Sequence, residues 1–88
     1  MTICLHPVFV KHYRGRIAVS QRLDRKYQER VRVFARDRGN IILRDHPLSG
    51  TKRHLRAFSV TGDIRAIYRL LQKGDVEFMD IGTHNQVY

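Results

Sequence analysis

The chain is 88 residues long, 42% of them hydrophobic, and its 17 Lys and Arg against 8 Asp and Glu give a net charge of +9. This length predicts one domain over residues 1–88 with a single modest core, and excludes a multi-domain enzyme. No run approaches the roughly 20 apolar residues of a membrane-spanning helix. The charge predicts a nucleic-acid partner, although a basic protein can also bind anionic lipid or simply be well solvated.

The cysteine content and the N-terminal residues indicate the cellular compartment of the protein. The only cysteine, Cys4, has no partner in the chain for a disulfide. The first residues have no charged segment followed by a long apolar run, which is the pattern of a secretory signal. We therefore expect a cytoplasmic protein that makes no use of a membrane.

The first half of the chain predicts a short strand and two helices. Residues 2–6 favour the strand, and Pro7 suits the first turn of a helix that reaches about Val19. Ser20 is a suitable N-cap for a second helix, which we expect to end at Gly39. Apolar residues at spacings of four, four and three form the stripe of this helix: Leu23, Tyr27, Val31 and Phe34.

The second half changes to the alternating pattern of strands. A loop at 45–50 is followed by three predicted strands, at 52–61, 64–71 and 76–81. Tight turns at 61–63 and 73–75 join these strands. The last residues, 82–88, have room for one short turn.

The predicted order is β-α-α-β-β-β, which is an α+β fold. Two N-terminal helices should pack on one face of a small antiparallel sheet and leave the other face partly open. On the strand at 64–71, Ile64, Ala66, Tyr68 and Leu70 share one face. Arg65 and Arg69 lie on the opposite face, where they could receive an RNA backbone.

Metal-independent cleavage of RNA requires a base, a cation for the charged phosphorane and an acid. Histidine and arginine supply these groups. The sequence holds such groups near the predicted sheet: His46, Asp63, Arg65, Arg69 and His84, with Tyr88 at the end. We predict RNA contacts from Lys52, Arg53, Arg56 and Arg69. Each also fits a structural role: His46 can shape a loop, Asp63 is a common turn residue, and Arg65 and His84 can be solvated.

No cofactor is expected. One cysteine and the absence of two histidines at helical spacing around a carboxylate exclude the familiar zinc patterns. His6, His12 and His54 are assigned to the surface or to packing. The aromatic residues of the helices are assigned to the core, and only Tyr88 is placed to stack on a base.

Three runs in the second half are specific as a set. They are DHPLSG at 45–50, RAFSVTGDIRAIYR at 56–69 and DIGTHNQVY at 80–88. With this order of elements, the chain resembles the RelE/ParE superfamily, and most of all its YafQ-like branch of messenger-RNA interferases.

The resemblance implies a small antiparallel sheet with two N-terminal helices and a toxin of a type II toxin–antitoxin pair. Such toxins enter the ribosomal A site and cut messenger RNA with the ribose 2′-OH as the nucleophile. By motif, His84 would be the main acid or base, with Asp63 orienting it. Arg65 would hold the scissile phosphate, His46 would assist in proton transfer, and Tyr88 matches the terminal aromatic residue.

The chain departs from this branch at Ser59, where the YafQ-like pattern has a further histidine. Two other functions therefore stay open. A ParE-type toxin would inhibit DNA gyrase by protein contact and needs no acid, base and cation in one pocket. A plain RNA-binding module would have lost the cleavage activity.

A basic ribonuclease must be held inactive in its own cell. We therefore expect a cognate antitoxin, acidic or amphipathic, that wraps the Arg-rich helices, covers the cleft, or does both, in a toxin–antitoxin hetero-oligomer. The other expected partners are the ribosome and messenger RNA.

Overall fold

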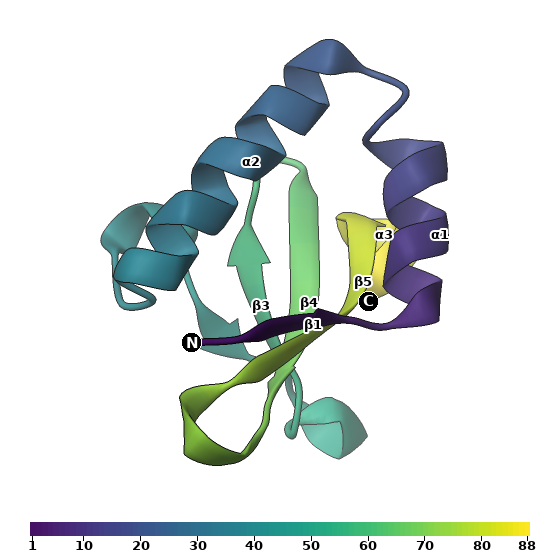
Figure 1. Cartoon of the computed structure of the whole chain (residues 1–88). Coiled ribbons are helices and arrows are strands. Elements are labelled where there is room, and N and C mark those ends of the chain that lie inside the picture. The colour runs from purple at the N-terminus through teal and green to yellow at the C-terminus, as the bar shows by residue number, and fades with distance from the viewer.

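The computed structural model describes all 88 residues as two helices lying across one face of a five-stranded sheet (Figure 1). The strands are β1 (Ile3–Leu5), β2 (His46–Pro47), β3 (Arg56–Ser59), β4 (Ile64–Leu70) and β5 (Val76–Thr83). The helices are α1 (Pro7–Arg16), α2 (Gln21–Arg36) and the short α3 (His84–Val87). The predicted α+β fold with two N-terminal helices on a small sheet is confirmed.

The strand order is β1-β5-β4-β3-β2, and the pairs from β5 to β2 are antiparallel. β1 runs parallel to β5, with Ile3 opposite Val76. The sheet is therefore mixed and not purely antiparallel as predicted. The reason is topological, because the first strand pairs with the last and the rest of the chain lies between them.

The helix starts follow the sequence signals, but the helices end earlier than predicted. His6 Nδ1 accepts a hydrogen bond from the Val8 amide at 3.0 Å, and Ser20 Oγ accepts one from the Leu23 amide at 3.3 Å. α1 ends at Arg16 because the amides of residues 17 and 18 both donate to the Tyr13 carbonyl, a pairing typical of a helix end. α2 ends at Arg36, so the predicted boundaries at 19 and 39 are too late.

The loop regions hold more structure than the sequence indicates. Two residues of the predicted loop pair with β3 as β2, and the predicted strand at 52–61 is reduced to Arg56–Ser59. A 3₁₀ turn at Gln72–Gly74 replaces the tight hairpin turn, with positive φ at Lys73 and Gly74. The last residues form the end of β5, which extends to Thr83, and then α3, which is the one short turn that was predicted.

An aromatic cluster forms the core between the helices and the sheet. The Phe34 ring lies 4.7 Å from Phe58, 4.9 Å from Tyr68 and 5.5 Å from Phe78, centroid to centroid. All four side chains are fully buried. Rings at these distances add attraction beyond the burial of their surface.

The second face of the sheet is partly covered by α3. Val87 packs there on Ala57 and Ile67 in a small buried cluster flanked by Leu48, Leu55 and Met79. Leu70, predicted on the core face, is 50% exposed, because it ends β4 at the hairpin that projects beyond the helices (Figure 1). The face that was predicted to be partly open is thus covered in part by α3.

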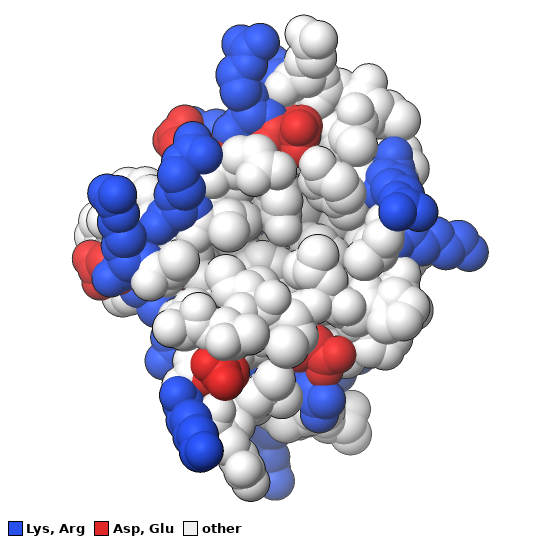
Figure 2. All heavy atoms as spheres, in the orientation of Figure 1, with Lys and Arg blue, Asp and Glu red and all other residues white.

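Charge is unevenly spread over the surface. Figure 2 shows Lys and Arg around the edge of this view, with the largest group on the side that carries α2, while the centre is almost free of charge. None of the helices is long and apolar enough to cross a membrane.

Candidate active site

Tyr88 connects two of the predicted catalytic histidines. Its hydroxyl lies 3.3 Å from His46 Nε2. Its ring meets the His84 ring edge to face, with centroids 4.2 Å apart. Since His84 begins α3 and Tyr88 follows it one turn later, residues at i and i+4 meet on the same side of the helix. Residues 46, 84 and 88 are thus brought together although 38 positions separate the first two.

The hydrogen bond at Nδ1, the other ring nitrogen of His46, determines which nitrogen carries the proton. His46 Nδ1 lies 2.8 Å from the carbonyl oxygen of Arg44. A carbonyl only accepts hydrogen bonds, so Nδ1 carries the proton and donates it. In the neutral ring, Nε2 is then left with its lone pair, which accepts from the Tyr88 hydroxyl. The exposed His46 therefore presents a basic nitrogen to the site.

The charge of Arg65 acts on the same phenol. Its Nη1 donates to the carbonyl oxygens of Thr61, at 2.9 Å, and Ile64, at 3.3 Å, which holds the half-buried guanidinium in position. Burial raises the pKa of Tyr88, and the Arg65 cation opposes this by stabilising the phenolate. The net effect is a raised pKa, so Tyr88 keeps its proton at neutral pH and acts as a hydrogen-bond donor.

Strand register explains why these groups share one face of the sheet. His46 is paired with Ala57, and Ser59 with Arg65. Residues directly opposite in an antiparallel pair point to the same side, and so do residues two apart on one strand. Ser59 is only 6% exposed and lies between His46 and Arg65 in this register. A serine hydroxyl does not titrate near neutral pH, so the groups here that could transfer a proton are the two histidines.

The side chains of two predicted site residues make no hydrogen bond or ion pair with this group. Asp63 is exposed in the turn before β4, and its amide donates to Thr61 Oγ1 at 3.2 Å. Neither a hydrogen bond nor an ion pair joins its carboxylate to His84, which was expected to be oriented by it. Arg69 is held at the other end of β4, where its guanidinium pairs with Glu77 at 2.7 Å.

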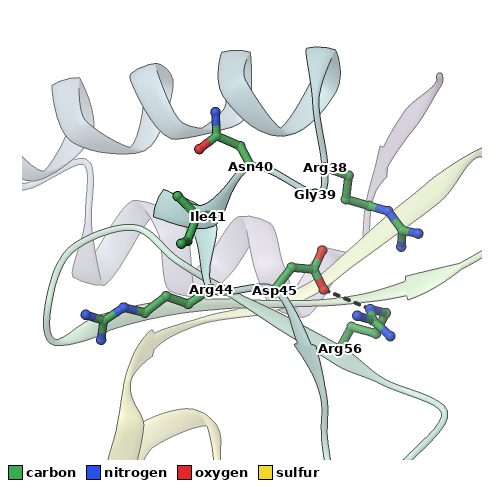
Figure 3. A pocket seen from close by; sticks show the side chains of 7 residues that line it. All are labelled: Arg38, Gly39, Asn40, Ile41, Arg44, Asp45 and Arg56. Atoms are coloured by element: carbon green, nitrogen blue, oxygen red, sulfur yellow. Dashed lines mark hydrogen bonds and ion pairs between the residues drawn. The ribbon is translucent and has the colours of Figure 1, made fainter.

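The predicted RNA-binding cations do not all lie on the side of the sheet that holds His46. Lys52 and Arg53 are exposed, and Lys52 lines an open pocket of about 320 Å³ together with Leu48 and Tyr88. Arg56 pairs with Tyr68 in the sheet, so it lies on the helix side, away from His46. There its Nε donates to Asp45 at 2.8 Å (Figure 3).

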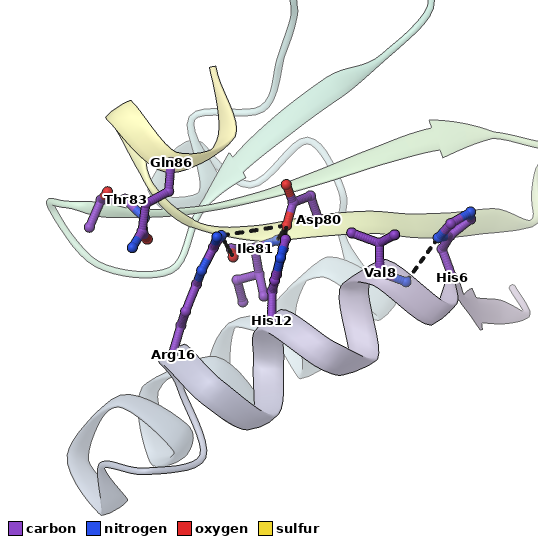
Figure 4. A network of polar contacts seen from close by, with 8 residues as sticks. All are labelled: His6, Val8, His12, Arg16, Asp80, Ile81, Thr83 and Gln86. Carbon is purple, nitrogen blue, oxygen red and sulfur yellow. Dashed lines mark hydrogen bonds and ion pairs between the residues drawn. The ribbon is translucent and has the colours of Figure 1, made fainter.

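A polar clamp from α1 positions the segment before α3, and the sequence reasoning missed it. His12 Nδ1 lies 2.6 Å from Asp80 Oδ1, and Arg16 Nη1 donates to the Ile81 carbonyl at 3.0 Å (Figure 4). The Asp80 carboxylate also accepts from its neighbour's amide at 2.8 Å. His12 was assigned to the surface or to packing. Its spacing of four from Arg16 on one face of α1 was the available signal.

Glycine at position 82 leaves room for the side chains of this clamp. A Cβ there would lie 2.7 Å from Arg16 Nη1 and 2.6 Å from Gln86 Oε1. The same Gln86 oxygen accepts from the Thr83 amide at 2.8 Å and so caps α3. The clamp therefore fixes the start of the helix that carries His84 and Tyr88.

No protein-family model and no curated protein sequence match this chain. Among solved structures, a copper-bound mutant toxin from Helicobacter pylori is 17% identical, covers 100% of this chain and 99% of its own, and has a TM-score of 0.81. E. coli YafQ is 21% identical over 98% and 96% of the two chains, with a TM-score of 0.75. A YoeB/ParE toxin from Agrobacterium tumefaciens is 19% identical over 96% and 99%, with a TM-score of 0.80.

These likenesses extend over essentially the whole of each chain. At this level of identity they establish a shared fold and carry no residue roles from one chain to another. The protein has the fold of the RelE/ParE-like toxins, with YafQ among its structural neighbours, in agreement with the resemblance found in the sequence.

Proposed function

We propose that this protein is the toxin of a type II toxin–antitoxin pair and a metal-independent endoribonuclease that cuts messenger RNA, in the ribosomal A site. One observation carries the proposal: His46 and His84 meet at Tyr88, on the face of the sheet that also holds Arg65. An acid, a base and a phosphate-binding cation are the groups that cleavage through the 2′-OH needs. No three potential metal-ligating side chains gather anywhere in the chain.

In the proposed reaction, the 2′-oxygen attacks the phosphorus and the bond from phosphorus to the 5′-oxygen breaks. The products are a 2′,3′-cyclic phosphate and a free 5′-OH. His84 is the principal proton-transfer group and protonates the leaving 5′-oxygen. His46, with its basic Nε2, assists by taking the 2′-OH proton once the substrate hydroxyl replaces that of Tyr88. Arg65 offers its free N–H groups to the phosphate oxygens.

The cleavage test uses translating ribosomes and a defined messenger. His84→Ala should reduce the cleavage rate by about 10²- to 10⁴-fold, the usual contribution of a positioned acid or base. Arg65→Gln should lower it by about 10²-fold or more, since a preorganised charge at the phosphate is lost. His54→Ala is the matched control, because His54 is exposed and makes no hydrogen bond.

Three results would contradict the nuclease assignment. The first is that the wild-type protein does not cut the messenger. The second is that wild type and His84→Ala cut at equal rates, and the third is that the purified protein inhibits gyrase supercoiling. The last of these would favour the gyrase-directed class of toxin.

The toxin role predicts an antitoxin. E. coli YafQ, a structural neighbour, is described in complex with DinJ as a toxin–antitoxin pair. The net charge of +9 on this chain suits an acidic partner. A small acidic protein encoded beside this chain should copurify with it and suppress cleavage. A chain that is expressed alone at high level without harm to the cell would count against the toxin role.

A further inference from the structure

The carboxylate of Asp45 lies on the helix side of the sheet and takes no part in the proposed reaction. Asp45 directly precedes His46 in the chain, and its side chain is only 8% exposed. One carboxylate oxygen accepts from Arg56 Nε at 2.8 Å (Figure 3), and the other accepts from the Tyr68 hydroxyl. Such a carboxylate is fixed in place, because moving it would leave buried donors and a buried charge without partners.

The two donors to Asp45 belong to neighbouring strands at the centre of the fold. Arg56 of β3 is paired with Tyr68 of β4. The Tyr68 ring packs edge-on against Phe34 in the core, and its hydroxyl also accepts from Arg38 Nη1 at 3.2 Å. The Asp45 carboxylate is therefore held by the sheet and the core, outside its own segment of chain.

The residue before Asp45 has an unusual backbone conformation. Arg44 has φ 49° and ψ 39°, in the left-handed region that non-glycine residues rarely adopt. The Arg44 side chain is exposed and makes no hydrogen bond, so it does not hold this conformation. Its neighbours do, since Leu43 is fully buried and Asp45 is fixed by its two donors. Backbone strain of this kind persists where the surrounding structure imposes it.

The conformation of Arg44 directs its carbonyl at His46. The oxygen lies 2.8 Å from His46 Nδ1, and this contact puts the proton on that nitrogen. In a neutral imidazole, the hydrogen bond at one nitrogen selects the tautomer. A change in the direction of the Arg44 carbonyl would therefore remove the contact that keeps Nε2 unprotonated.

We propose that Asp45 is a positioning residue that acts through the Arg44 carbonyl to keep His46 in its Nδ1–H tautomer. The carboxylate lies on the helix side of the sheet, and the imidazole that it orients lies on the opposite side. Asp45 makes no hydrogen bond with the imidazole, so it acts by way of the backbone. The role rests on the proposed nuclease function, in which His46 Nε2 takes the 2′-OH proton.

Strand pairing alone does not explain the tautomer. β2 has two residues and pairs on one side only, because it is an edge strand of the sheet. Its pairing with β3 fixes the backbone of His46 but does not choose between the two ring nitrogens. The group at Nδ1 makes that choice, and this group is the carbonyl of the residue before Asp45.

The tautomer can be measured without RNA. The ¹⁵N chemical shifts of an imidazole distinguish a protonated from an unprotonated ring nitrogen, and His46→Gln identifies the His46 signals among the five histidines. Spectra are recorded at pH 8.5, well above the ordinary histidine pKa of about 6.5. The wild type should show a protonated Nδ1 and an unprotonated Nε2. In Asp45→Asn, whose amide has one acceptor oxygen in place of two, the Nδ1–H fraction should fall by about twofold or more.

Two further variants separate positioning from charge. Tyr68→Phe removes one donor to Asp45 and changes no charge at this pH, so it should shift the tautomer in the same direction by a smaller amount. Glu77→Gln is the matched control, because Glu77 forms a comparable ion pair with Arg69, at 2.7 Å, on β4 and β5. It should leave His46 as in the wild type. Tyr68→Phe also decides the question if Asp45→Asn does not fold.

Single-turnover cleavage at saturating substrate connects the tautomer with the reaction. The rate of Asp45→Asn should fall by at least the factor by which its Nδ1–H fraction falls, since only that tautomer presents a basic Nε2. Glu77→Gln should cut like the wild type. A protein that cuts no RNA would refute the proposed nuclease, and the spectra would still decide the role of Asp45.

Three spectroscopic results would overturn the proposal. The first is a protonated Nε2 in the wild type. The second is an unchanged His46 tautomer in both Asp45→Asn and Tyr68→Phe, which would mean that the pairing of β2 is enough to orient the imidazole. The third is a shift in Glu77→Gln as large as that in Asp45→Asn, which would make loss of charge the cause.

Discussion

At the residue scale, Tyr88 contributes to the candidate site in two ways. Its ring packs against His84, and its hydroxyl donates to His46 Nε2. Burial raises the pKa of this phenol, with Arg65 opposing the shift, so the hydroxyl stays a donor at neutral pH. The two contributions can be separated by substitution.

Tyr88→Phe should keep the ring against His84 and lose the hydrogen bond to His46. We expect cleavage to fall by about tenfold, comparable with the loss of one neutral hydrogen bond of about 1.4 kcal/mol. Tyr88→Ala should cost more, since it also removes the ring. Single-turnover cleavage at pH 7 measures the rate of each variant against that of the wild type. Equal rates for wild type and Tyr88→Ala would exclude Tyr88 from the site.

The Tyr68 hydroxyl joins three polar side chains on the helix side of the sheet. Its hydroxyl donates to Asp45 and receives hydrogen bonds from Arg38 and Arg56, while the Asp45 side chain is only 8% exposed. Burial, strengthened by the hydrogen bond to Asp45, raises the pKa of Tyr68 to about 12. The folded protein therefore holds this proton more tightly than the unfolded chain, in which tyrosine titrates near pH ~10.

The stabilisation from Tyr68 should be complete below pH ~10 and should be lost as the pH rises from ~10 toward ~12. Tyr68→Phe removes it and leaves Asp45 with one donor fewer, so we expect a loss of about 1–3 kcal/mol at pH 8. Urea unfolding at pH 8 and pH 11 measures both effects. The difference between wild type and variant should narrow at pH 11, and a constant difference would contradict the assigned proton.

At the element scale, the clamp from α1 decides where α3 lies. α3 has four residues, too few to be stable by themselves. Arg16 and Asp80 fix the chain before it, and Gln86 caps its first turn. The hydrogen bonds of Arg16 and Gln86 both use the space that Gly82 leaves.

Gly82→Ala should displace the side chains of Arg16 and Gln86 and break their hydrogen bonds. We expect a loss of about 1–2 kcal/mol in the free energy of unfolding and slower cleavage, since His84 is no longer held. Gly15→Ala is the control, because nothing lies within 4 Å of a Cβ there and alanine favours a helix by about 1 kcal/mol. Thermal melting compares the two, and an unchanged Tm for Gly82→Ala would refute the clamp.

At the scale of the whole molecule, one aromatic core supports both sides of the sheet. Phe34, from α2, contacts rings from β3, β4 and β5. A domain of this length is stabilised by about 4–13 kcal/mol in total. We therefore expect the helix side and the site side to unfold together.

Phe34→Ala should cost about 3–5 kcal/mol, a large part of the stability of the domain. Val19→Ala is the control, because Val19 is 75% exposed, and its cost should stay within about 0.5 kcal/mol. Circular dichroism in urea should show one cooperative transition for both variants, shifted far to lower urea for Phe34→Ala. A small shift there would mean that the core repacks around the cavity.

The first residues of the helices and the alternation of side chains along the strands were predictable, because both depend on residues that are close together in the sequence. Ser20 caps α2 as expected, and the alternation in β4 makes Arg65 and Tyr68 face opposite sides of the sheet. The composition indicated a polyanion partner, and the motif order indicated the fold. The roles of Asp63, Arg56 and Arg69 were predicted from motif resemblance and from the sequence pattern, which say nothing of ion pairs or of the residues opposite on neighbouring strands.

Local chemistry in the sequence determined the helices, the strands and the basic character of this protein. Only the tertiary structure decided that β1 joins β5 in parallel, that His46 meets Tyr88, and that Arg56 turns away from the site. Each of these depends on contacts between positions far apart in the chain. Such contacts form through packing and register, and neither is written in the spacing of a short motif.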